Sequence, residues 1–263
     1  MRIEASRIAA LLSRPALAAQ PLELRREGPV FLIGFALPAQ PTLETVFDSD
    51  CQTPVELLVF DLPDAAALTA ATELIALLKK NLRGFVLASL GFRPLRRQLE
   101  AAYACGVDLL DIPLDPTADW TGAAVREQLD ALAQAREIFP RWAVAATLGW
   151  AVAPYVMQEA VDELLRNHLV PLVSLDARCP SLQGESVAPV YAHLVEGWRR
   201  AGVSLRPWMP LIELTTPLLQ RAPRTFVGNL LGRARDARLR AGSDLRRLLR
   251  VREVEQSFDS AGL

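Results

Sequence analysis

The stretch Val107-Asp-Leu-Leu-Asp-Ile112 is short, almost continuously apolar, and carries an acidic residue near its end. A run of this kind is typical of a parallel strand that is buried on both faces of a sheet. Six more runs of the same character lie before and after it: Val30–Ala36, Glu56–Phe60, Gly84–Ser89, Ala143–Leu148, Val170–Leu175 and Ser204–Met209. Repeated buried strands along one chain indicate an α/β fold.

Helical patterns occupy the intervals between these runs. Apolar residues recur on one helical face within residues 63–80, 122–139, 157–168 and 187–198. The strands start every 23 to 36 residues, which leaves room for one crossover helix each. Such units are right-handed in nearly all proteins. We therefore predict a partial TIM-type (βα) barrel of six to seven parallel strands with the helices outside.

A doubly wound open sheet is the alternative fold. Sheets of that kind usually carry a glycine-rich, phosphate-binding turn after the first strand. Here the turn reads Leu37-Pro-Ala-Gln-Pro-Thr42 and contains no glycine. The barrel is therefore the preferred prediction.

The length and composition indicate a single barrel domain. The chain has 263 residues, 51% of them hydrophobic, and no stretch resembles a flexible linker between domains. We expect a helical lead-in over residues 1–29, the barrel over residues 30–230, with a last short strand near 224–229, and a basic helical tail over residues 231–263. The arginines of the tail are interpreted as the solvated face of an amphipathic helix.

The charge balance excludes several classes of partner. With a net charge of −1, the chain has no overall field that would attract nucleic acid or an anionic membrane surface. No apolar run is long enough to span a bilayer. The N-terminal stretch is interpreted as an amphipathic helix and not as a signal peptide. We expect a cytoplasmic protein with no nucleic-acid or membrane partner.

Scarce residue types limit the chemistry. The only lysines, Lys79 and Lys80, end a helical stretch and are expected to face water, so no Schiff-base lysine is predicted. His168 and His193 lie on different predicted helices, which disfavours a His-rich zinc site. The three cysteines are scattered and odd in number, and fit neither a disulfide framework nor a close-spaced metal motif.

The polar residues that close the predicted strands form the candidate site. In a (βα) barrel the working face lies at the carboxyl ends of the strands. Asp61, Asp111 and Asp176 are the candidate catalytic residues, because their carboxylates would face one cavity. The candidate ligand-binding residues are Ser89, Asp115, Thr147, Arg178, Cys179 and Arg206. Together they would orient a polar ligand, hold a divalent cation, or supply a general acid and base.

A structural role competes with this interpretation. Asp61, Asp115 and Asp176 each precede a proline closely and could cap a helix or fix a turn. Asp111 differs, because it lies inside an apolar run, where a carboxylate is costly without a partner.

The order of elements over residues 30–210 resembles the radical S-adenosylmethionine superfamily. Val59-Phe-Asp-Leu-Pro-Asp64, with its following helix, is similar to the second unit of that family. Residues 84–91 are similar to the third strand and its turn. Leu99–Asp115 is similar to the fourth unit, in which a helix runs through a glycine into a strand closing on Leu-Asp. The resemblance implies an incomplete parallel barrel.

The residues that define that family are absent. The family binds a [4Fe–4S] cluster through Cys-x3-Cys-x2-Cys in the loop after the first strand. Here that loop, Leu37–Phe47, has no cysteine, and Cys51 alone cannot ligate a cluster. Asp61–Asp64 replaces the Gly-Gly-Glu motif that contacts the methionine amine. The resemblance therefore implies a cluster-less relative, and no catalytic residue is carried across.

Two functions follow as hypotheses. The first is a non-redox accessory or partner subunit of an enzyme of the same pathway, or a small-molecule-binding scaffold, with no cofactor predicted. The second is a barrel enzyme that uses the strand-end aspartates on a small polar substrate. S-adenosylmethionine and a divalent cation stay open as ligands. A mouth plugged by apolar side chains such as Trp150, Tyr155, Trp208 and Met209 would favour the scaffold, and a wet cavity with converging polar groups would favour the enzyme.

Overall fold

The structure, a computed structural model, describes residues 1–114, 123–150, 153–177, 179 and 184–219. Residues Met1–Gln220 form one compact unit. This unit is an α/β fold built on a seven-stranded sheet, with helices alternating with the strands along the chain.

Six strands of the sheet are parallel and follow one another in chain order. They are β3 (Val30–Ile33), β4 (Leu57–Leu62), β5 (Phe85–Leu90), β6 (Leu109–Asp111), β7 (Val144–Gly149) and β8 (Val170–Ser174). A seventh strand, β2 (Leu24–Glu27), pairs antiparallel with β3 at one edge. The six parallel strands confirm six of the seven predicted runs. Because β2 and β8 stand at opposite ends of the hydrogen-bonded order, the sheet is open.

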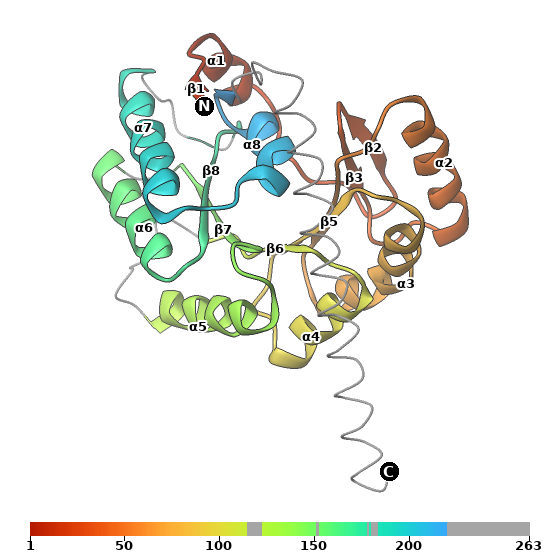
Figure 1. Cartoon of the computed structure of the whole chain (residues 1–263). Helices are drawn as coiled ribbons and strands as arrows, with labels where there is room; N and C mark the ends of the chain where they lie inside the picture. Colours follow the sequence, from red (N-terminus) through yellow and green to blue (C-terminus); the bar gives the residue numbers. More distant parts are fainter. Residues whose placement is uncertain (115–122, 151–152, 178, 180–183, 220–263) are drawn as a thin grey trace, which may run out of the picture. The chain divides into compact units, whose positions relative to one another are not determined.

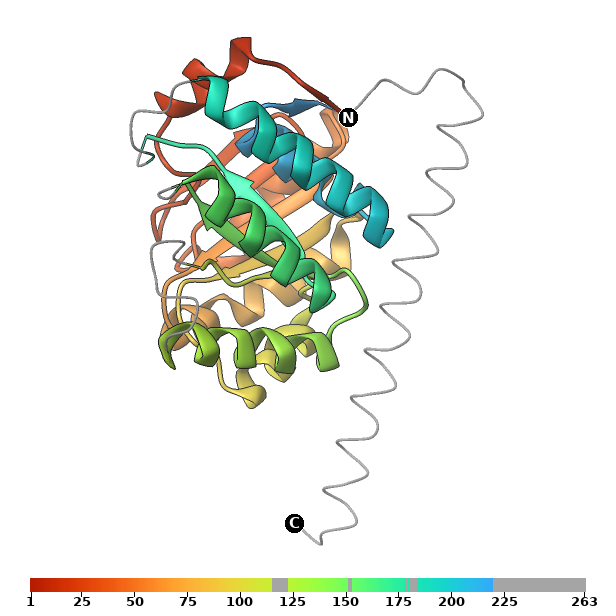
Figure 2. The same cartoon turned by 90° about the vertical axis from the view of Figure 1, so that its left-hand side faces the viewer.

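One helix follows each of the six parallel strands. They are α2 (Ala39–Gln52), α3 (Ala65–Asn81), α4 (Arg96–Cys105), α5 (Ala123–Ile138), α6 (Pro154–Arg166) and α7 (Gly184–Ala201). In Figure 1 these helices follow each other around the outside of the strands. Figure 2, turned to the side of α6 and α7, shows these two helices packed together in front of β8.

Local sequence explains where these elements begin and end. Helix α3 begins at Asp64, whose carboxylate accepts a 2.8 Å hydrogen bond from the N–H of Ala67. Helix α4 ends at Gly106, whose φ of 125° suits glycine. The strands between the helices are almost entirely buried, with Leu58, Phe60 and Val86 at 0% exposure. Burial of both faces explains why their sequences are continuously apolar.

The face of the sheet opposite helices α2–α7 is covered by two segments that lie far apart in the chain. The first contains β1 (Arg2–Ile3) and α1 (Ser6–Leu12), and the second contains η1 (Arg206–Trp208), α8 (Met209–Thr215) and β9 (Leu218–Leu219). Strands β1 and β9 pair antiparallel. The Arg7 guanidinium also donates to the main-chain carbonyl of Glu213. The two segments therefore form one cover, seen around α8 in Figure 1.

The expected strand Ser204–Met209 was wrong. These residues form η1 and the start of α8. Pro207 has no N–H to donate, which disfavours a strand in this run. It is apolar for another reason: the Trp208 indole is buried and donates a 2.9 Å hydrogen bond to the Trp142 carbonyl.

Two other expectations need correction. Residues 1–29 contain the helix α1, but they also supply β2, the edge strand of the sheet. Lys80 is exposed, as expected, whereas Lys79 is mostly buried and its Nζ lies 2.8 Å from the buried Asp108 Oδ2.

The expected strand at 224–229 and the tail 231–263 lie outside the described residues. Within the described part, no helix combines the length and apolarity needed to cross a membrane.

Candidate functional site

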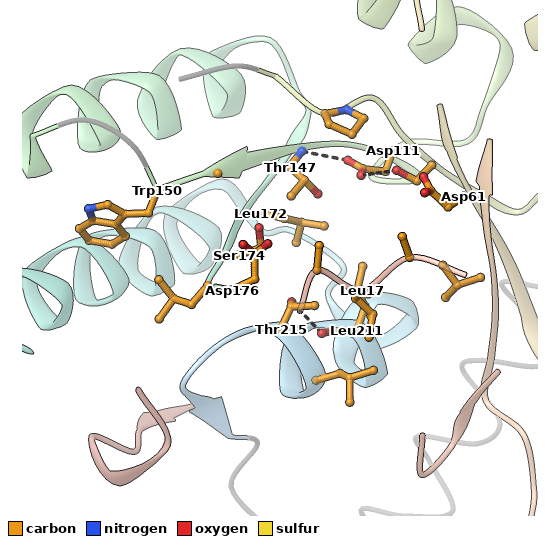
Figure 3. A pocket seen from close by; sticks show the side chains of 18 of the residues that line it. Leu17, Asp61, Asp111, Thr147, Trp150, Leu172, Ser174, Asp176, Leu211 and Thr215 are labelled. Atoms are coloured by element: carbon orange, nitrogen blue, oxygen red, sulfur yellow. Dashed lines mark hydrogen bonds between the residues drawn. The ribbon is translucent and has the colours of Figure 1, made fainter. Parts of the chain in front are cut away.

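A cavity of about 500 Å³ lies against the face of the sheet opposite the helices α2–α7, toward the carboxyl ends of the strands. Figure 3 shows the side chains that line it. The polar groups come from five neighbouring strands and the turns that follow them: Asp61, Ser89, Asp111, Thr147, Ser174, Asp176 and Cys179. The apolar residues that line the cavity include Leu17, Val59, Leu87, Trp150, Leu172, Leu211 and Leu214.

The strand register explains why these residues share one face. Asp61 of β4 lies opposite Ser89 of β5, and Ser89 lies opposite Asp111 of β6. Toward the β8 end of the strand order, Gly149 of β7 lies opposite Ser174 of β8. Because side chains alternate along a strand, the residues two positions earlier, such as Val59 and Leu87, also face the cavity.

Asp111 is the most deeply buried carboxylate of the cavity, with 4% of its surface exposed. The Ser89 hydroxyl donates to Asp111 Oδ2 at 3.1 Å, and the Thr147 N–H donates to Oδ1 at 2.9 Å. Burial raises the pKa of Asp111 to about 6, against the hydrogen bonds from Thr147 and Ser89, while the nearby Asp61 charge raises it further. Asp111 can therefore gain or lose a proton near neutral pH.

Asp61 and Asp176 also line the cavity, as expected. Asp64, and not Asp61, caps α3, and a turn-fixing role for Asp61 stays a prediction. Asp176 belongs to a turn in which its carbonyl accepts from the Cys179 N–H at 3.0 Å. In Figure 3, Asp61 lies beside Asp111 at one end of the cavity, and Asp176 lies toward Trp150.

The remaining wall comes from the cover. Residues 14–18, which follow α1, and Leu211, Leu214 and Thr215 of α8 line the cavity. The Ala177 N–H donates to the Arg14 carbonyl at 2.8 Å, and the Leu175 N–H donates to the Thr215 carbonyl at 3.0 Å. The Arg14 guanidinium forms an ion pair with Glu27 at the end of β2. These bonds hold both segments of the cover against the end of β8.

The structure brings together six of the nine predicted site residues. Arg206 is not among them: it is exposed on η1 and does not line the cavity, because the strand expected to carry it does not form. Asp115 and Arg178 lie outside the described residues. Of the apolar residues considered as a plug, Trp150 lines the cavity, Tyr155 is 65% exposed, and Trp208 and Met209 are buried elsewhere.

Sequence reasoning did not identify the cover as part of the site. Nothing local in residues 14–18 indicates a binding wall, since their position depends on pairing with a segment some 200 residues away. Ser174 is different, because its two-residue spacing from Leu172 and Asp176 is a sequence signal that places all three on one face.

Among the described residues, no three His, Cys, Asp or Glu side chains are grouped so as to hold a metal ion. The three cysteines lie on separate elements: Cys51 on α2, Cys105 at the end of α4 and Cys179 after β8. No protein-family model matches the chain, and no curated protein sequence matches it significantly.

Proposed function

We propose that the chain is a partial (βα) barrel that binds a small polar molecule in the cavity between its strands and their cover. The proposal treats the chain as a non-redox binding protein, a cluster-less barrel of the radical S-adenosylmethionine type that serves as an accessory subunit. Six parallel strands in consecutive order, with helices outside, support this description.

The observation that carries the proposal is the convergence of Asp61, Ser89, Asp111, Thr147 and Ser174 on one cavity. These residues come from five successive strands. Concave sites with a few converging polar groups and apolar walls are typical of small-molecule sites, and 500 Å³ lies within their usual size range. A scaffold plugged by apolar side chains would not leave this space.

Ligand-detected thermal stabilisation tests the proposal. The full chain would be screened against S-adenosylmethionine, divalent cations and a panel of cationic, anionic and neutral metabolites. A ligand at a hundred times its Kd stabilises the folded state by about 2.7 kcal/mol, which is readily seen as a shift in Tm.

A cavity-filling variant locates the binding. Thr147→Met adds bulk beside Asp111 and should remove the stabilisation, whereas Thr69→Met makes the same change at an exposed position of α3 and should keep it. No hit in the whole panel, or a hit that Thr147→Met leaves intact, would contradict the proposal.

Asp111 favours a second candidate, an enzyme that uses general acid–base catalysis. Its carboxylate faces the cavity, is buried, and has a pKa near 6, which suits proton transfer at neutral pH. Each stabilising compound would be followed by NMR for conversion. Asp111→Asn should abolish conversion while the folded protein still binds; conversion at an unchanged rate would exclude this role.

A further inference from the structure

We infer that the ligand of this cavity is a cation: a molecule with a protonated amine or amidine group at Asp111 and an apolar body against the leucine side of the cavity. The inference rests on the proposed function and adds the chemical class of the ligand. It starts from the charges of the cavity.

The described lining carries an excess of negative charge. Asp61, Asp111 and Asp176 contribute carboxylates, and Arg14 contributes a guanidinium. The Arg14 guanidinium is already paired with Glu27. At Asp111 an anionic ligand would meet a buried carboxylate, whereas a cation would be attracted to it.

Asp111 is the carboxylate at which we expect the cationic group to bind. The carboxylate is 4% exposed, and its described hydrogen-bond partners are the Ser89 hydroxyl, the Thr147 N–H and the Thr147 side chain. Within the described residues, no Lys, Arg or His forms an ion pair with it. A buried carboxylate without a counter-charge is costly. A carboxylate has about four lone-pair sites, so an ammonium N–H can still donate to Asp111.

The opposite side of the cavity suits an apolar group. Leu17 and Leu211 of the cover lie across from Asp111 in Figure 3, and Leu172 of β8 lines the sheet wall next to Thr147. An ammonium alone would leave these side chains in contact with water. An alkyl or cyclic body attached to the amine would instead bury them, at roughly 25 cal/mol per Å² of apolar surface. The ligand is therefore an amphipathic amine and not a simple inorganic cation.

Three compounds of one shape test the charge class on the full chain. Cyclohexylmethylamine, cyclohexylmethanol and cyclohexanecarboxylate differ chiefly in the charge of one exocyclic group. Saturation-transfer NMR titrations at millimolar concentration give their affinities. We expect the amine to bind at least about tenfold more tightly than the alcohol, because a charged hydrogen bond is stronger than a neutral one, and the carboxylate to bind most weakly.

Two variants assign the effect to Asp111. Asp111→Asn keeps the shape of the side chain and removes its charge, and should weaken amine binding by about tenfold to a hundredfold with little effect on the alcohol. Asp48→Asn makes the same change in net charge on the exposed face of α2 and should have no effect. Equal loss of amine binding in both variants would overturn the inference.

The pH dependence gives an independent readout. Asp111 faces Asp61 from β4, and the cavity also holds Asp176, Cys179 and the Arg14 guanidinium. Amine affinity should fall as the pH drops through about 6, since Asp111 takes up a proton there, and Asp111→Asn should remove most of this fall.

The outcomes separate the inference from the proposed function. If the carboxylate or the alcohol binds as well as the amine and Thr147→Met blocks it, the cationic class is wrong and the binding function stands. If none of the three compounds binds, the cationic class is also wrong, and the wider thermal screen alone decides the binding function.

Discussion

The N–H of Thr147 donates to the carboxylate of Asp111 at 2.9 Å, across the boundary between β7 and β6. On the same pair of strands, the N–H groups of Ile112 and Leu114 donate to the carbonyls of Ala145 and Thr147. The carboxylate thus takes the place of a main-chain acceptor in the ladder. This arrangement fixes the orientation of Asp111 and ties the site to the pairing of two central strands.

The first prediction concerns Asp111 and pH. Its folded-state pKa of about 6 lies above the ordinary value of 3.8. Between these two pH values, the native protein keeps a proton on Asp111 that the unfolded chain has lost. Ionisation of Asp111 therefore opposes folding. Compared with Asp111→Asn, the free energy of unfolding of the wild type should fall by up to ~3 kcal/mol as pH rises from about 4 to above 6.

Urea denaturation at a series of pH values measures this difference. Asp48→Asn should follow the wild type at every pH, because Asp48 is exposed. A difference between wild type and Asp111→Asn that stays constant with pH would show that Asp111 does not titrate in this range.

The second prediction concerns the buried ion pair at the opposite end of β6. Lys79 Nζ lies 2.8 Å from Asp108 Oδ2, which also accepts the Val86 N–H at 3.0 Å. Lys79→Met removes the Lys79 ammonium from the buried Asp108 carboxylate and should cost about 3–5 kcal/mol. Lys80→Met changes the adjacent, exposed lysine and should stay within about 0.5 kcal/mol. Chemical denaturation of both variants checks this; equal losses would refute the assignment.

The third prediction concerns Tyr191 of α7. Its hydroxyl donates to the Val173 carbonyl at 2.8 Å, and burial raises the pKa of this phenol well above 10. Tyr191→Phe leaves the carbonyl without this donor and should cost about 1–3 kcal/mol. Tyr155→Phe removes a hydroxyl from a side chain that is 65% exposed and should be nearly neutral. Thermal unfolding of the two variants compares them directly, and a neutral Tyr191→Phe would contradict the prediction.

The fourth prediction concerns Gly34, directly after β3. A Cβ at this position would clash with the main-chain carbonyl oxygens of Gln20 and Pro21. Gly34→Ala must displace backbone and should cost about 1–3 kcal/mol or more. Gly149→Ala is the control, because a Cβ there meets nothing within 4 Å. If Gly34→Ala unfolds at the same urea concentration as the control, the close approach of residues 20–21 is not as described.

The sheet could be predicted from sequence because its strands are buried on both faces. Continuous apolar runs identified β3 to β8 and, through their ends, the residues that now line the cavity. The same signal failed at Ser204–Met209, where apolar side chains are buried from a short helix. It also failed at β2, whose sequence Leu-Arg-Arg-Glu has no apolar run.

The position of β2 depends on contacts that no local pattern reveals. Arg26 donates to the carbonyls of Ser49 and Thr53 at the end of α2, and its guanidinium lies 5.4 Å from the Phe31 ring centroid. Polar residues in this strand are therefore used for packing. The cover was unpredictable for the same physical reason, since it is held by pairing between distant segments.

The pairing of β1 with β9 also fixes the order in which the molecule can mature. During synthesis the strands can associate one after another as each leaves the ribosome, since every parallel pair is local in sequence. Residues 14–18, by contrast, form the wall of the cavity together with α8, which is made after all the strands of the sheet. The cavity is thus completed after the sheet, and nascent chains that stop before α8 should carry an intact sheet but no enclosed cavity.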